Sequence, residues 1–322
     1  ELREVVYITS LFYCLYMSYT TLNKIKIVFR CLVGLVFLFS AYLKVIAING
    51  FEIYVYTVNP FNLNFSFFFA RLIIGVEFTI GILLLLGYRY KIIHTISIVL
   101  LSIFSIFLIT QLVAGSKENC FCFGDAISFT PLESLVKNIA LIIILLIIRK
   151  LPATQFRYIS IVSLLFSVGG LVVPFIISPP DNWVQNRYAQ YTEFDAEILT
   201  QTLTEPIYEG KHLNEGKKLI CYFSMGCEYC KLTAGKITGM SEKQSIDSNI
   251  IYLFMGDEKN LNQFWDDSDS KKFTYYILPV EDFFKASGSH LPAIYFVDNG
   301  NVVKKAAYRT LNDKDVATFF GK

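Results

Sequence analysis

Long apolar segments alternate with short polar connections up to about residue 180, and a pattern typical of a water-soluble domain follows. A helix needs roughly 20 apolar residues to cross the hydrocarbon core of a bilayer. Pro179 and Pro180 stop a helix where this half ends. The predicted spans are Ile27–Ile48, Phe67–Leu86, Ile92–Ala114, Leu135–Ile148, which is short and can begin earlier, and Tyr158–Ile177.

Glu1–Leu22 has a short apolar core, and the pattern leaves open an extra span, an interfacial helix or an upstream extension. It lacks the basic front and the small-residue cleavage site of a secretory signal. The predicted organisation is an N-terminal segment 1–24, a transmembrane bundle 25–150, a fifth transmembrane helix 151–180 and a soluble domain 181–322.

Basic residues occur on alternate connections between the spans. They are Lys24, Lys26 and Arg30, then Arg89 and Lys91, then Arg149, Lys150 and Arg157. Connections rich in Lys and Arg stay in the cytoplasm. The loops 49–66 and 115–134 and the C-terminal domain are therefore predicted to lie outside. An added N-terminal span would leave this placement unchanged.

Composition agrees with a membrane protein. Hydrophobic residues make up 54% of the 322 residues and charged residues 17%, and the net charge of +2 says little about partners. No run of Lys and Arg would follow a nucleic-acid backbone. Membrane lipids are predicted partners, and nucleic acid is not.

Two closely spaced cysteine pairs stand out among the seven cysteines. In "KLICYFSMGCEYCKLT", a strand-like run is followed by a turn, and a helix opens at Cys227 and Cys230. The N–H groups of a helix start favour a thiolate, so Cys227 is the predicted attacking residue. Cys230, one turn later, is expected to be buried and to resolve a mixed disulfide. The alternative is half of a zinc site, for which His212 and His290 are the available partners; we predict no metal site.

The segments after this helix complete a recognisable pattern. "NIIYLFMG" predicts a strand, "EKNLNQFWDD" a helix, "SHLPAIYFVDNGNVVKKAAY" a hairpin, and "TLNDKDVATFFGK" a closing helix capped by Asn312. The whole resembles the thioredoxin fold over about Asn186–Lys322. This resemblance implies that Leu291–Pro292 is the cis-proline pair that binds the partner's chain.

Three departures from thioredoxin bear on the chemistry. Glu228 and Tyr229 replace Gly-Pro between the cysteines, and Cys221 stands where thioredoxin has a buried acid. The third is the charge of Glu228, which opposes thiolate formation at Cys227 and favours a reducing couple. Cys221 itself is interpreted as a buried core thiol.

The second pair, Cys120 and Cys122, lies in "CFCFGD" after the third predicted span. This loop resembles the Cys-x-Cys-Phe-Gly loop of the MauE branch of the DoxX family. "RCLVGLVFLFSAYLK" and "LIIGVEFTIGILLLLG" resemble the first two helices of that family. The resemblance implies a four-helix membrane bundle and a link to the maturation of disulfide-rich periplasmic enzymes. The predicted fold is a membrane α-helical bundle, with a four-helix DoxX/MauE-like core and a fifth span, followed by an α/β thioredoxin-like domain.

A disulfide between Cys120 and Cys122 would close a small, strained ring, and strained disulfides are labile. The pair could therefore exchange electrons with Cys227 and Cys230. The alternatives are inert loop thiols or a static disulfide to another segment.

Charged residues inside spans are expensive and usually functional or paired. Lys44, Arg71 and Glu77 lie in the outer half of the first two spans. They could hold a quinone headgroup or move protons. A structural ion pair of Glu77 with Lys44 or Arg71 is the alternative.

The favoured hypothesis is a membrane thiol–disulfide oxidoreductase in the bacterial inner membrane, with its thioredoxin-like domain in the periplasm. It would pass electrons between the Cys-x-Cys centre, linked to a quinone or another carrier, and the Cys-x-x-Cys centre. The Cys-x-x-Cys centre would need no cofactor and would act on exported cysteine-containing proteins. The alternative is a non-catalytic accessory subunit of an envelope complex, with the thioredoxin-like domain as a docking surface. Copper handling ranks last, because soft-metal ligands are scarce. The direction of electron flow stays open.

Overall fold

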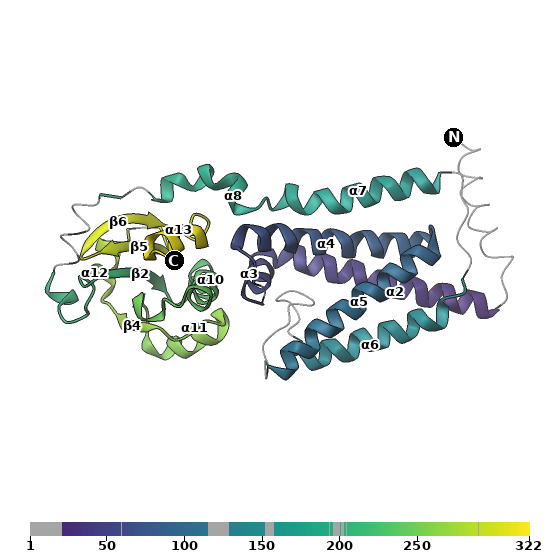
Figure 1. Ribbon diagram of the computed structural model, residues 1–322, viewed down its shortest axis with the longest axis horizontal. Coiled ribbons are helices and arrows are strands. Elements are labelled where there is room, and N and C mark those ends of the chain that lie inside the picture. Colours follow the sequence, from purple (N-terminus) through teal and green to yellow (C-terminus); the bar gives the residue numbers. More distant parts are fainter. Residues whose placement is uncertain are drawn as a thin grey trace. The chain divides into compact units, whose positions relative to one another are not determined.

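The computed structural model of the chain describes residues 21–58, 60–114, 129–151, 158–192, 194–195, 200, 203, 205–288 and 290–322. It contains two compact units. The helical unit comprises the chain up to Ala47 together with Arg71–Ile176, and the α/β unit comprises Ile48–Ala70 and Ile177–Lys322. The two units are described separately below (Figure 1).

Five long apolar helices confirm the predicted spans. They are α2 (Thr21–Ile46), α4 (Leu63–Leu86), α5 (Tyr90–Val113), α6 (Pro131–Ile148) and α7 (Ile159–Ile177). Helix α6 begins before the apolar run because Thr130 and Glu133 cap it reciprocally. The Thr130 side chain accepts from the Glu133 N–H at 3.3 Å, and the Glu133 carboxylate accepts from the Thr130 N–H at 2.8 Å.

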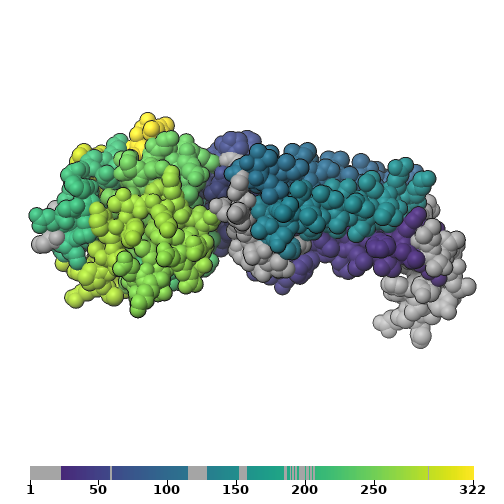
Figure 2. All heavy atoms as spheres, turned by 90° about the horizontal axis from the view of Figure 1, so that it is seen from below, coloured from purple at the N-terminus to yellow at the C-terminus, as the bar shows by residue number. Residues whose placement is uncertain are grey.

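Glycines bring the helices of the helical unit into close contact. A Cβ added at Gly34 of α2 would lie 2.9 Å from the Gly81 carbonyl oxygen of α4. A Cβ at Gly75 of α4 would lie 2.9 Å from the Gly170 carbonyl oxygen of α7. Small residues at such crossings let helix backbones approach closely in a membrane. Figure 2 shows α5 and α6 side by side along one face of this unit.

The α/β unit is built on a five-stranded mixed sheet in the order β4-β3-β2-β5-β6. The strands are β2 (Lys217–Ser224), β3 (Ile250–Met255), β4 (Thr274–Ile277), β5 (Ala293–Asp298) and β6 (Asn301–Ala306). Strand β2 pairs in parallel with β3 and antiparallel with β5. The predicted hairpin joins β5 to β6, and its turn residues Asn299 and Gly300 have positive φ angles of 48° and 83°.

Helices cover both faces of this sheet, as in a thioredoxin-like fold (Figure 1). One face carries α10 (Glu228–Gln244), α11 (Leu261–Ser268) and α13 (Asp313–Phe320), and the other carries α12 (Val280–Ser287). The sequence prediction did not include β4 or α12. Short helical elements also belong to the unit: α8 (Asp181–Val184) and the 3-10 helices η1 (Gln185–Thr192), η2 (Pro206–Tyr208), η3 (Asp247–Asn249) and η4 (Glu258–Asn260).

Helix α3 (Ile48–Val58) occupies part of the predicted connection 49–66, and its 11 residues are too few for a further span. Tyr56 of this helix is fully buried in the apolar core that α10 and the sheet share. The Lys243 ammonium of α10 donates to the Tyr56 carbonyl oxygen at 2.6 Å. The α/β unit therefore includes 48–70 in addition to 177–322, which contains the predicted domain 181–322.

Candidate active site

The two cysteines of the Cys-x-x-Cys motif lie at the start of α10. Strand β2 ends at Ser224, and Cys227 is the N-cap residue of the helix. Its sulfur accepts a hydrogen bond from the Cys230 backbone N–H at 3.3 Å. Both residues are free thiols, Cys227 half-buried and Cys230 fully buried. This is the geometry predicted from the sequence, with an accessible sulfur ahead of a protected one.

The local environment shifts the pKa values of the two thiols in opposite directions. The pKa of Cys227 is lowered from 9.0 to about 7, first by the side-chain hydrogen bond with Cys230 and then by the backbone N–H groups of Cys230 and Tyr229. Burial and the negative charge of Glu228 act in the opposite direction. Burial raises the pKa of the Cys230 thiol. A large share of Cys227 is therefore thiolate at neutral pH, while Cys230 keeps its proton.

Cys221 occupies the middle of β2, where it pairs with Tyr252 of β3. It is fully buried, and burial raises the pKa of its thiol well above the ordinary value. It packs with the apolar core beneath α10. The thiol is placed as a core side chain, as the sequence indicated.

A cavity of about 400 Å³ opens beside the motif. Tyr229, which lies between the two cysteines, and the Leu291–Pro292 pair contribute to its wall, and the Leu291–Pro292 bond is cis as the thioredoxin resemblance implied. The Tyr229 ring lies 5.3 Å from the Tyr308 ring, centroid to centroid. The residues around the cavity are Tyr188, Tyr229, His290, Leu291, Pro292, Ala307, Tyr308 and Arg309.

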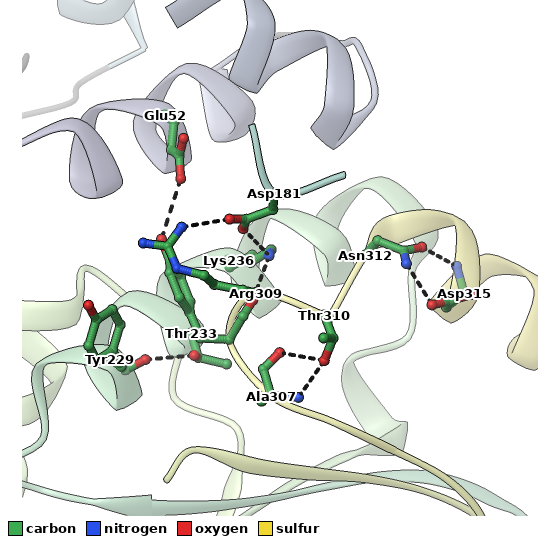
Figure 3. Close-up of polar contacts among 11 residues, drawn as sticks. Glu52, Asp181, Tyr229, Thr233, Lys236, Ala307, Arg309, Thr310, Asn312 and Asp315 are labelled. Carbon is green, nitrogen blue, oxygen red and sulfur yellow. Dashed lines mark hydrogen bonds and ion pairs between the residues drawn. The ribbon is translucent and has the colours of Figure 1, made fainter. Parts of the chain in front are cut away.

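A buried polar cluster that the sequence did not reveal adjoins the cavity through Tyr308 and Arg309 (Figure 3). The Lys236 ammonium of α10 is fully buried, donates to the Tyr308 carbonyl oxygen at 2.9 Å and lies 3.8 Å from the Asp181 carboxylate. Asp181 also accepts from the Arg309 guanidinium at 2.7 Å. The Tyr308 hydroxyl lies 3.5 Å from the Glu52 carboxylate of α3. These residues come from four separate segments, so no local motif could have indicated them.

Burial lowers the pKa of Lys236, and the carboxylates of Asp181 and Glu52 oppose this effect. A buried ammonium is costly unless it is paired and hydrogen-bonded, and both conditions hold here. The cluster therefore fixes the loop that carries Tyr308 and Arg309 against α10.

In the helical unit, the structure brings together two of the three predicted charged residues. The Lys44 ammonium lies 2.8 Å from the Glu77 carboxylate, and both side chains are 5% exposed. Ser40 donates to Glu77 at 3.0 Å and accepts from Lys44 at 2.7 Å. Arg71 is fully buried on the same helix as Glu77. The structural ion pair of Glu77 with Lys44, considered as the alternative, is present.

Cys120 and Cys122 lie outside the described residues, as does most of the ambiguous segment Glu1–Leu22. Within the described ranges, no group of three or more His, Cys, Asp or Glu side chains is close enough to hold a metal ion. His212 pairs instead with Glu215 at 3.0 Å on the surface, and His290 borders the cavity.

An apolar helical module followed by a thioredoxin-like α/β domain, with Cys-x-x-Cys at a helix start, defines a membrane protein of the thiol–disulfide oxidoreductase type. Comparison with known proteins agrees with this class. Residues 22–150 match the family model of methylamine utilisation protein MauE, so the N-terminal region contains a MauE domain. Protein TlpB of Flavobacterium psychrophilum is 26% identical over 329 aligned residues, which cover 85% of this chain and 89% of that protein. No solved structure gives a significant match.

Proposed function

We propose that the chain is a membrane thiol–disulfide oxidoreductase that exchanges electrons between exported proteins and a membrane-bound carrier. The observation that carries this proposal is the contrast between Cys227, half-buried with a pKa of about 7, and Cys230, buried with a raised pKa. Thiol–disulfide exchange requires this pairing of an accessible thiolate with a protected second thiol.

In the reducing direction, the Cys227 thiolate attacks one sulfur of a client disulfide. The client S–S bond breaks, a mixed disulfide forms, and the second client sulfur leaves as a thiolate that takes up a proton. Cys230 then loses its proton and attacks the Cys227 sulfur, which breaks the mixed disulfide. The products are a client dithiol and a Cys227–Cys230 disulfide, so two electrons have moved to the client. Every step is reversible, and the reverse sequence oxidises the client.

The second half of the proposal concerns Cys120 and Cys122. We assign them as the pair that exchanges two electrons with Cys227 and Cys230, and a quinone as the carrier that exchanges two electrons and two protons with them. The basic connections support a location of both pairs on the outer side of the bacterial inner membrane. Labelling intact cells with an impermeant thiol reagent tests this placement. Protection of either pair in intact cells, lost on permeabilisation, would contradict it.

A trapping experiment tests the exchange chemistry. Cys230→Ser removes the resolving thiol, so mixed disulfides through Cys227 should accumulate and appear as larger species on non-reducing gels of whole membranes. Treatment with a reductant should cleave these mixed disulfides, so that the larger species disappear. The double variant Cys227→Ser/Cys230→Ser is the matched control and should give none. Absence of adducts with Cys230→Ser, while Cys227 remains alkylatable, would contradict the proposal.

A companion experiment tests the relay. Cys120→Ser/Cys122→Ser should shift the steady-state redox state of Cys227 and Cys230 in cells, because their electron partner has been removed. Reduced and oxidised forms are separated by alkylation with a large maleimide. An unchanged ratio of reduced to oxidised Cys227 and Cys230 would contradict the proposed relay. It would not contradict the proposed exchange between clients and the Cys227–Cys230 pair.

A further inference from the structure

The cavity beside the Cys-x-x-Cys motif has a chemical character that indicates what it binds. Three tyrosine rings and the apolar side chains of Leu291 and Pro292 form most of its wall. Its volume of about 400 Å³ is large enough for one or two amino-acid side chains. Arg309 is the fixed charge among the eight lining residues, and none of the eight is an acid.

Arg309 is held in position by three neighbours. One terminal nitrogen donates to Asp181 at 2.7 Å. The guanidinium carbon lies 5.4 Å from the ring centre of Tyr188 and 5.6 Å from that of Tyr308. Contacts of this kind restrict a flexible arginine to one orientation. The Arg309 guanidinium is therefore ordered before any ligand binds.

The second terminal nitrogen of Arg309 points away from Asp181 (Figure 3). Among the described residues, Asp181 is the carboxylate that pairs with this guanidinium. Asp181 and Glu52, the acids of the buried cluster, do not line the cavity. A guanidinium can bind two carboxylates on different edges, because it carries five N–H donors in a fixed fork.

We propose that this cavity binds an acidic side chain of the client, close in sequence to its reacting cysteine, and that Arg309 is the residue that selects it. The proposal rests on the proposed function, since a client must reach Cys227 for the cavity to matter. The proposal is based on charge complementarity. The ordered Arg309 cation lies in a partly buried cavity, and none of the eight residues that line this cavity is an acid. A charge-assisted hydrogen bond in such a place discriminates far better than one in open solvent.

Single-turnover exchange with synthetic peptides tests the proposal. The reduced full-length protein in detergent micelles is mixed with peptides that each carry one intramolecular disulfide and differ only at a neighbouring position, Glu, Gln, Lys or Phe. Formation of the Cys227–Cys230 disulfide is followed by acid quench and alkylation. We expect the Glu peptide to react about tenfold faster than the Gln peptide, the order that one charge-assisted hydrogen bond gives. Added salt should reduce this advantage.

Variants at Arg309 complete the test. Arg309→Gln should abolish the preference for Glu, so the Glu and Gln peptides should react with this variant at the same rate, whatever its absolute rate. Arg309→Lys keeps the charge without the fork and should keep part of the preference.

Equal rates with the Glu and Gln peptides, or a faster reaction with the Lys or Phe peptide, would overturn the inference and leave the proposed function intact. Failure of the reduced protein to react with any peptide would count against the proposed function itself.

Discussion

At the residue scale, the reactivity of Cys227 depends on the helix that follows it. The sulfur accepts a hydrogen bond from the Cys230 N–H, which also donates to the Cys227 carbonyl oxygen at 3.1 Å in the first turn of the helix. The neighbouring Glu228 charge partly opposes this stabilisation of the thiolate. Cys230 thus lowers the pKa of the Cys227 thiol and Glu228 raises it, and experiments can separate the two effects.

The rate of alkylation of Cys227 should rise with pH around a midpoint near 7, the value of its pKa. The thiolate is the nucleophile, so the rate falls as pH drops through the folded-state pKa. Iodoacetamide labelling of the reduced protein, followed by peptide mass spectrometry, measures it. Cys221 and Cys230 should stay unlabelled under these conditions, because both are buried with raised pKa values. A midpoint near 9 at Cys227 would contradict the assignment.

A matched pair of variants separates the local charge from the helix start. Glu228→Gln should move the midpoint for Cys227 below that of the native chain, because the Glu228 charge raises the pKa. Glu242→Gln, near the other end of α10, should leave the midpoint unchanged. An identical midpoint in both variants would show that Glu228 has no influence.

The sequence predicted this part of the site well because its members are neighbours. A strand, a turn and two cysteines one helical turn apart are a local pattern, and local patterns can be read directly. The cluster of Asp181, Lys236 and Arg309 is different, because tertiary folding brings its members together from distant segments. Nothing in the local sequence of Lys236 distinguishes it from a solvated helical lysine.

At the element scale, α10 packs so closely on α3 that one methyl group would not fit. A Cβ at Gly239 would lie 2.9 Å from the ring of Tyr56 and 3.0 Å from the Thr57 side chain. In an open helix, replacing Gly by Ala stabilises by about 1 kcal/mol. Gly239→Ala should instead destabilise the α/β unit by about 1–3 kcal/mol, the usual range for overpacking.

Thermal unfolding followed by circular dichroism measures this effect. Gly226→Ala is the matched control, because a Cβ there would meet nothing within 4 Å. It should change the melting temperature little. A gain in stability with Gly239→Ala would show that α3 and α10 are not in close contact.

The Lys44–Glu77 pair can be tested as a unit of α2 and α4. Glu77→Gln alone leaves a buried ammonium without its carboxylate, and loss of one partner of a buried pair typically costs about 3–5 kcal/mol. Lys44→Met/Glu77→Leu removes both charges and should recover most of the melting temperature in detergent. If the folded double variant also loses the proposed electron exchange with a quinone, the pair has a functional role; retained exchange assigns it a structural one.

The sequence predicted long elements more reliably than short ones. The five spans are visible because each contains far more apolar residues than a soluble helix would. Strand β4 has four residues and α12 has eight, and elements this short contain too few repeats of a pattern to be recognised from the sequence. Helix α3 was not expected because its 11 residues are too few for a span, and it packs on α10, which is distant in the sequence.

At the scale of the whole molecule, the α/β unit is assembled from two stretches of chain. Tyr56, Leu63 and Phe67 from 48–70 contribute buried side chains to its core. A fragment of residues 177–322 alone would expose the surfaces that cover them, and each such side chain stabilises by about 1.5–3 kcal/mol. We expect this fragment to melt at a lower temperature than the same fragment joined to 48–70 by a flexible linker.

Tyr56→Asp in the joined fragment provides the matched control. A carboxylate cannot be buried in this core without a partner, so the benefit of the added segment should be lost. Equal melting temperatures for the single and joined fragments would show that 48–70 is dispensable.

The chain leaves α7 at Ile177, and Asp181 and Tyr188 soon afterwards hold Arg309 in place beside the cavity. The residues that follow the last span are thus also part of the surroundings of Cys227 and Cys230. A chimaera that grafts this domain onto a foreign anchor at residue 190 would discard both supports of the arginine. Transplantation should therefore keep residues from 177 onward, because a shorter graft would leave Arg309 without Asp181 and Tyr188.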